Sequence, residues 1–149
     1  MMNAVPFPQA NNLDIILDLI NIFPDTGYLP EMVANYLNYE IREGQYYLRA
    51  LSYIGITTQN NSISYLTEYG KKIQVEPSIR LKKIFLISQI FQNETLAEMY
   101  RKSEDLTQSK DRIDFFTKYI EVHIKLNEVT ANRRASTINT WFNWIDSNL

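Results

Sequence analysis

The sequence contains no cysteine, a single histidine and only four glycines among its 149 residues. Without cysteine, the chain can form neither a disulfide framework nor a thiolate metal site. The glycines, at positions 27, 44, 55 and 70, are too sparse for a glycine-rich phosphate loop. His123 falls within a predicted helix, where a structural role is the simpler explanation. We therefore expect no metal ion and no cofactor.

Long apolar stretches are absent as well, so the sequence predicts no transmembrane segment and no membrane partner. The first residues show no basic stretch followed by an apolar one, which argues against a secretory signal. Together with the lack of cysteine, this favours a cytoplasmic location. With 45% hydrophobic residues and only five prolines, the chain can bury a sizeable core.

Positive charge is missing from the first forty residues. The net charge of the whole chain is −2, which by itself argues against a nucleic-acid binder. Residues 1–40 carry −5, however, whereas residues 41–93 carry +4 and residues 94–149 carry −1. The sign changes at Arg42, the first basic residue. The middle of the chain is therefore compatible with attraction to DNA phosphates.

Catalytic motifs are also missing. Metal-dependent nucleases of the restriction type need an Asp/Glu-x-Lys step beside further carboxylates. No acidic residue in this sequence is followed by lysine two positions later. The step His123-x-Lys125 resembles part of a phosphodiesterase motif but lacks an aspartate at the required spacing. We predict that the chain has no catalytic residue and is not an enzyme by itself.

Apolar spacing and turn residues predict three helices followed by a β-hairpin. The expected elements are helices over about residues 12–23, 30–38 and 42–54 and strands over 56–58 and 63–66. Asn11 or Asn12 is expected to cap the first helix, Pro30 to begin the second and Gly55 to end the third. Thr67 would cap a short helix after the hairpin. This order is typical of a winged helix-turn-helix.

The second half of the sequence predicts helices alone. Their expected ranges are about 78–91, 95–101 and 109–126, followed by a last helix, and Ser109 and Thr130 are expected to cap the last two helices. In the first of them, one side is expected to face inward: Leu81, Ile84, Phe85 and Ser88. In the last, the expected inward residues are Ile138, Trp141, Trp144 and Ile145. We interpret both tryptophans as core anchors.

The predicted fold class is mainly α with a small β-hairpin. The expected division is an extended arm over 1–11, a winged helix-turn-helix over 12–75 and a helical unit over 76–149 packed on the first. Segments 43–55 and 133–145 align without gaps, so that Leu48 corresponds to Ile138 and Leu51 to Trp141. We interpret the last unit as a second helix-turn-helix without a wing; two unrelated amphipathic helices would align equally well.

The third predicted helix carries polar side chains on its outer side. Arginine can bind the edge of guanine and glutamine that of adenine in the major groove. We predict base contacts by Gln45, Tyr46 and Arg49. Contacts to phosphates are predicted for Arg42, Asn60, Asn61 and Lys71. The alternative is an ordinary solvated helix face beside a hairpin turn, where asparagine is favoured anyway.

The last predicted helix offers a second set of DNA contacts: Arg133, Arg134, Ser136 and Asn139. Two arginines near a helix N-terminus oppose the positive end of the helix dipole. Binding of an anion by these two arginines could offset this cost. The alternative is an ion pair of either arginine with Glu128 or Asp111.

Three segments carry a family resemblance: Arg42-x-Gly-Gln-Tyr-Tyr-Leu-x-Ala-Leu-x-Tyr-Ile-Gly-Ile, Leu66-Thr67-x-x-Gly70 and Thr130-x-x-Arg-Arg-Ala-Ser-Thr-Ile-x-x-Trp-x-x-Trp-Ile. They resemble the winged-helix DNA-binding domains attached to type II restriction endonucleases, over nearly the whole chain from Leu13 to Ile145. In that family such a domain recognises the DNA target and a separate nuclease domain cuts. The resemblance therefore implies a recognition module and not an active nuclease.

Two classes of function remain open. The first is a sequence-specific binder of double-stranded DNA, either stand-alone or partnered by a nuclease domain or subunit of a restriction-modification system. The second is a protein-interaction or dimerisation module with little DNA affinity, including a homodimer. The acidic first forty residues favour the second class, and the polar face of the third helix favours the first.

Overall fold

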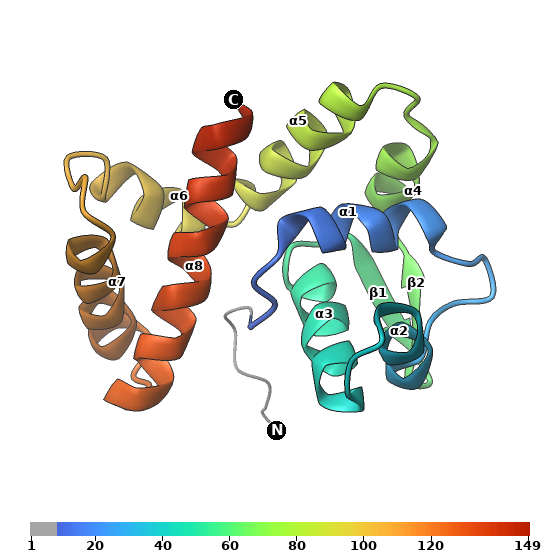
Figure 1. The fold of residues 1–149 in the computed structure, drawn as a ribbon, viewed down its shortest axis with the longest axis horizontal. Helices are drawn as coiled ribbons and strands as arrows, with labels where there is room; N and C mark the ends of the chain where they lie inside the picture. The colour runs from blue at the N-terminus through green and yellow to red at the C-terminus, as the bar shows by residue number, and fades with distance from the viewer. Residues whose placement is uncertain (1–8) are drawn as a thin grey trace.

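Three helices precede a single β-hairpin in the computed structural model, which describes residues 9–149 (Figure 1). The first part comprises α1 (Leu13–Ile22), α2 (Pro30–Leu37), α3 (Ile41–Tyr53), β1 (Thr57–Asn60), β2 (Ile63–Leu66) and α4 (Glu68–Val75). The second comprises α5 (Ile79–Ile90), α6 (Glu94–Lys102), α7 (Ser109–His123) and α8 (Glu128–Asn148). The mainly helical, winged helix-like fold class is therefore confirmed. The predicted arm over 1–11 lies outside the described residues except for its last three.

Local signals in the sequence account for the boundaries of the first elements. The Asn12 side chain caps α1 by accepting from the backbone N–H of Asp14 at 2.9 Å. Pro30 occupies the first position of α2, where its missing N–H costs nothing. After α3, Gly55 adopts a left-handed φ of +79°, a conformation that glycine reaches without steric penalty. All three predicted signals are confirmed.

The hairpin turn is shorter than predicted. Asn60 belongs to β1 and pairs with Ile63, which leaves only Asn61 and Ser62 as the turn. Both have positive φ, of 52° and 70°, the geometry of a two-residue turn that matches the twist of its strands. Asparagine tolerates this backbone conformation better than most residues.

Tyr28 adds a third, one-residue strand to the hairpin, which sequence periodicity did not reveal. Its backbone exchanges two hydrogen bonds with Ser64 of β2, at 2.8 and 2.9 Å. The Tyr28 ring also meets Phe23 edge to face, with centroids 4.8 Å apart. This bridge connects the segment before α2 to the wing, and so fixes the hairpin beside the helix-turn-helix.

Thr67 joins the hairpin to α3 and α4. Its hydroxyl lies 2.8 Å from the carbonyl oxygen of Gly55 and 3.0 Å from that of Ile56, and it accepts from the Gly70 N–H at 3.2 Å. We expect Thr67→Ala to lower the free energy of unfolding by about 1–2 kcal/mol, because both the cap and the tie to α3 are lost. Urea denaturation followed by circular dichroism measures this. Thr67→Ser is the matched control and should retain most of the stability; equal losses in both variants would contradict the hydrogen-bonding role.

The second part is built around α7 and α8, which run antiparallel side by side (Figure 1). Aromatic rings fill the space between α5, α6, α7 and α8. Phe142 contacts Tyr100 and Phe116 edge to face, with centroids 5.0 and 5.4 Å apart, and Phe91 packs on Tyr100 at 4.9 Å. The burial of Ile138 and Trp141 matches that of Leu48 and Leu51. The internal repeat itself stays a prediction.

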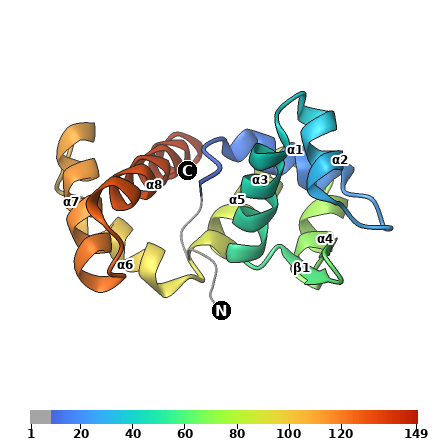
Figure 2. The same cartoon turned by 90° about the horizontal axis from the view of Figure 1, so that it is seen from below.

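One side of α8 is attached to the start of the chain. The indole N–H of Trp141 donates to the Ala10 carbonyl at 2.8 Å, and that of Trp144 to the Asp14 carboxylate at 3.0 Å. Thr137 and Asn11 are joined through their side-chain oxygens at 2.7 Å. In both views α8 therefore lies between α7 and the winged part (Figures 1 and 2). Trp141 is fully buried and Trp144 partly so, which confirms them as packing residues.

Two details of the helical half are predicted wrongly. In α5 the buried residues are Leu86, Ile87 and Ile90, whereas Leu81 and Ile84 are 40% and 37% exposed. This helix has apolar residues on nearly every side, so periodicity cannot select its buried face. In α8 the cap is Asn127, whose side chain accepts from the Thr130 N–H at 2.9 Å, rather than Thr130.

Two boundaries of α7 also shift. The helix begins with Ser109 itself, preceded by Gln108, so Ser109 is its first residue and not its cap. It ends at His123, three residues earlier than predicted, because Lys125 takes a left-handed φ of +64° that starts the turn into α8. The division at residue 75 stays a prediction, and the buried hydrophobic residues of both halves form one cluster.

Candidate nucleic-acid interface

The exposed side of α3 is a polar stripe. Arg42, Arg49 and Ser52 are exposed and Gln45 is half-buried, at spacings of three and four residues that place them on one side of the helix. The opposite side is buried in the core through Tyr47, Leu48 and Leu51. The structure is therefore consistent with the prediction that three side chains of this helix face outward: Arg42, Gln45 and Arg49. We call this set, with Ser52, the α3 stripe.

Gly44 allows α3 to approach α2 closely. A Cβ atom at this position would overlap the Pro30 carbonyl oxygen at the start of α2 and would lie 3.2 Å from the Ala34 backbone nitrogen. Both are backbone atoms, so they cannot yield as a flexible side chain would. The glycine thus sets how α2 holds α3, and with it the orientation of the α3 stripe.

Tyr46 lies four residues after Arg42 and three before Arg49, so it borders the α3 stripe. It is half-buried and lines a hollow of about 270 Å³ with Glu43, Tyr47 and residues 9–12. The neighbouring Tyr47 is buried, and this burial raises the pKa of its hydroxyl. Tyr46 therefore lies at the edge of the α3 stripe that is nearest to the end of the arm.

The wing presents Asn60 and Asn61 to solvent, as predicted. Their side chains make no hydrogen bond within residues 9–149, so they are accessible to a ligand. The left-handed backbone of Asn61 explains the choice of asparagine without any ligand. The phosphate contact predicted for Asn60 and Asn61 therefore stays a prediction.

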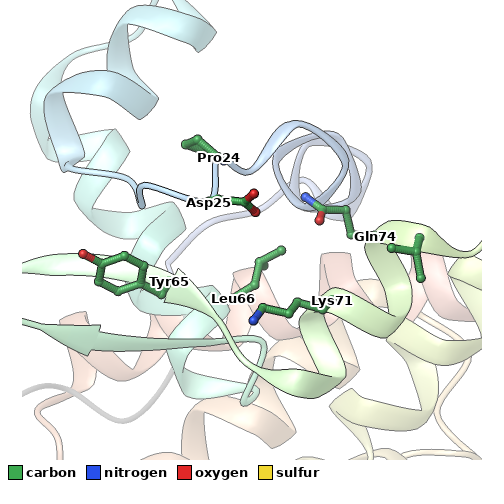
Figure 3. A pocket seen from close by; sticks show the side chains of 7 residues that line it. Pro24, Asp25, Tyr65, Leu66, Lys71 and Gln74 are labelled. Atoms are coloured by element: carbon green, nitrogen blue, oxygen red, sulfur yellow. The ribbon is translucent and has the colours of Figure 1, made fainter.

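Lys71 belongs to a different part of the surface. It is exposed and lines a hollow of about 450 Å³ with Asp25, Tyr65 and Gln74, between the α1–α2 turn, β2 and α4 (Figure 3). No residue of α3 or α8 lines this hollow. The structure therefore does not join Lys71 to the α3 stripe.

The four predicted contact residues of α8 divide into two pairs. Arg133 and Ser136 are exposed, but Arg134 and Asn139 are each only 5% exposed. The prediction that Arg134 and Asn139 lie on an open surface is wrong. They fall on the two sides of α8 that pack against other elements, and a helix with two buried sides leaves only a narrow strip to solvent.

Arg134 lacks a counter-ion within the described chain. None of the ion pairs within residues 9–149 includes Arg133 or Arg134, so the expected alternative of pairing with Glu128 or Asp111 is not realised. Burial lowers the pKa of the Arg134 guanidinium, and the nearby charges of Arg133 and Arg49 lower it further, against an opposing effect of Tyr46. Residues 9–12 join the two helices: α8 is hydrogen-bonded to Ala10 and Asn11, and α3 lines a hollow together with residues 9–12.

Residues 9–149 gather no group of three acidic or histidine side chains able to hold a metal ion. Over the same residues, no helix has both the length and the apolar character needed to cross a membrane. His123 lies at the end of α7, where it stacks on Tyr119 with ring centroids 4.2 Å apart.

A family model described as a domain of unknown function (DUF7226) matches residues 15–149. The chain belongs to the DUF7226 family. The matched region begins within α1 and continues to the end of α8, so the DUF7226 domain includes the winged part and the helices that follow it. No curated protein and no solved structure matches the chain.

Proposed function

We propose that this DUF7226 domain binds double-stranded DNA with the α3 stripe in the major groove. The observation that carries the proposal is the stripe itself. Arg42 and Arg49 are exposed and form no ion pair within residues 9–149, on a helix held by α2 and flanked by a wing. From Arg42 to Ser52 the stripe extends about 15 Å along the helix, comparable to the major-groove width of about 12 Å.

Each member of the stripe has a specific part in this proposal. Gln45 and Arg49 lie in the middle, where their side chains would reach base edges, adenine for glutamine and guanine for arginine. Arg42, at the start of the helix, would contact a phosphate. Asn60 and Asn61 at the wing tip and Arg133 on α8 would contact the backbone on either side.

The proposal extends to the biological role of the domain. The segments that resemble restriction-enzyme recognition domains include α3 and α8, the two helices that supply the proposed contacts. We infer that the domain recognises a target sequence for a nuclease domain or subunit that does the cutting, in the cytoplasm. A nuclease encoded beside this chain, or in a longer chain that contains it, would support this assignment.

The test is binding to duplex DNA, measured by fluorescence anisotropy after selection from random sequences. We expect Arg49→Ala to weaken binding to the selected duplex by about 1–3 kcal/mol, roughly tenfold or more, and to relax the sequence preference. Arg42→Ala should weaken binding to all duplexes alike and reduce the salt dependence. Arg101→Ala on α6, also exposed, is the control and should bind like the wild type. Wild-type affinity and selectivity in Arg49→Ala would refute the assignment of the stripe.

A protein-interaction surface is the second candidate, favoured by a separate observation. Large apolar side chains are exposed along α2 and the link to α3: Met32, Tyr36, Tyr39 and Ile41. Exposed apolar patches of this kind often bind proteins, including a second copy of the chain. This candidate predicts weak DNA binding with little dependence on salt, whereas steep salt dependence would favour DNA. Light scattering of the purified protein would show whether it forms a homodimer.

A further inference from the structure

Arg134 is a buried cation that residues 9–149 do not neutralise. Its side chain is 5% exposed, its Nε atom has no hydrogen-bond partner, and no carboxylate lies within ion-pair distance. Burying a charge without a partner is costly, and buried arginines in proteins are normally paired. An unpaired one therefore requires an explanation, such as a ligand that supplies the missing negative charge.

The neighbours of Arg134 increase this cost. The charged groups that act on it are Arg133 on the same helix and Arg49 on α3, together with the Tyr46 hydroxyl. Neither of these arginines belongs to an ion pair within the described chain. Both arginines lower the pKa of the Arg134 guanidinium, so their positive charges oppose its own. Such an arrangement disfavours the free protein and favours a complex with an anion.

The position of Arg134 is fixed by the helix that carries it. Thr137 and Trp141, one and two turns further along the same side of α8, are hydrogen-bonded to Asn11 and Ala10. This row of side chains therefore faces the end of the arm, whose residues 9–12 line a hollow with Glu43, Tyr46 and Tyr47 of α3. These bonds fix the position of α8 relative to the arm, and with it the backbone that carries Arg134, which favours a preformed site.

We propose that Arg134, in the positive field of Arg49 and Arg133, binds a phosphate group at the end of the arm, between α8 and α3. A guanidinium group is planar and can donate two parallel hydrogen bonds to a phosphate, and it always carries its charge. In the complex proposed above, the ligand would be a backbone phosphate beside the groove that α3 enters. That extension rests on the proposed DNA binding, whereas the phosphate site itself does not.

The first experiment uses inorganic phosphate as the probe, compared with chloride at equal ionic strength. Saturating phosphate should raise the Tm of the wild type by about 5 °C, because it binds only the folded state. Arg134→Met keeps the apolar stem but removes the charge. It should have the same Tm as the wild type or a higher one in chloride, and should lose the response to phosphate. Arg101→Met is the control and should keep the full response.

A second variant tests the site even if Arg134→Met does not fold. Arg133→Gln changes an exposed side chain, so it should fold normally while showing a reduced phosphate response. A Tm that phosphate leaves unchanged in the wild type would overturn the proposed site. An equal phosphate response in the wild type and in both variants would overturn it too.

The second experiment measures binding to duplex DNA. Its result distinguishes failure of the phosphate site from failure of the proposed function. Arg134→Met should bind the selected duplex about tenfold more weakly, the effect of losing one strong phosphate contact. Wild-type affinity in this variant, with Arg49→Ala still impaired, would refute a DNA phosphate as the ligand of Arg134 and leave DNA binding by the α3 stripe intact. A phosphate response without any duplex binding would support the site and refute DNA as the ligand.

Discussion

Gly44→Ala should lower the free energy of unfolding by about 3 kcal/mol, although alanine is the better helix former. The added methyl group would overlap the Pro30 carbonyl oxygen, so α2 and α3 could no longer pack at their native separation. At an exposed position inside a helix, Gly→Ala would raise the free energy of unfolding by about 0.5–1 kcal/mol. A loss of stability in Gly44→Ala would therefore indicate the close packing of α2 on α3. Urea denaturation followed by circular dichroism measures it.

The control for this substitution is Ser52→Ala on the exposed side of the same helix, expected to change stability by no more than about 0.5 kcal/mol. On the proposed function, Gly44→Ala should also lose DNA affinity beyond its loss of folded protein, because the α3 stripe would be tilted. A neutral or stabilising Gly44→Ala would show that α2 and α3 are not packed as described.

The second large effect is expected for Trp141→Ala, with a loss of about 3–5 kcal/mol. Trp141 is the largest fully buried side chain, and its indole N–H is bonded to the Ala10 carbonyl. The substitution opens a cavity between α8 and the start of the chain and leaves that carbonyl without its partner. Thermal and urea unfolding followed by far-ultraviolet circular dichroism would give the loss, because the fluorescence signal itself changes with the substitution.

Trp144→Phe is the matched control for this second prediction. Trp144 is only partly buried and its hydrogen bond to Asp14 is exposed, so the expected cost is about 1 kcal/mol. The cost of Trp141→Phe should lie between those of Trp141→Ala and Trp144→Phe, because phenylalanine fills most of the cavity but cannot make the hydrogen bond. Equal costs for Trp141→Ala and Trp144→Phe would contradict the central position of Trp141.

The features that the sequence predicted well depend on residues close together in the chain. The cap at Asn12, the start of α2 at Pro30, the end of α3 at Gly55 and the cap at Thr67 each depend on backbone geometry within a few residues. The order of three helices and a hairpin follows from these signals. So does the polar side of α3, because its apolar side is clearly periodic.

The features that the sequence predicted wrongly depend on distant contacts. The buried face of α5 is chosen by its neighbours, since apolar residues surround the helix. Arg134 and Asn139 looked like surface residues because polar side chains are usually exposed, and nothing nearby in the sequence indicates that two sides of α8 are covered. Only the hydrogen bonds from α8 to Ala10 and Asn11 reveal that Arg134 faces the end of the arm.

The bond between Trp141 and Ala10 also has a consequence for the order of folding. It joins residues 131 positions apart, and the bonds of Thr137 to Asn11 and of Trp144 to Asp14 have similarly high sequence separations. During synthesis, the winged part can form its hairpin and helices well before α8 leaves the ribosome. Until then, the apolar surface that Trp141 later covers is open to water, and the nascent chain is most prone to aggregation in that interval.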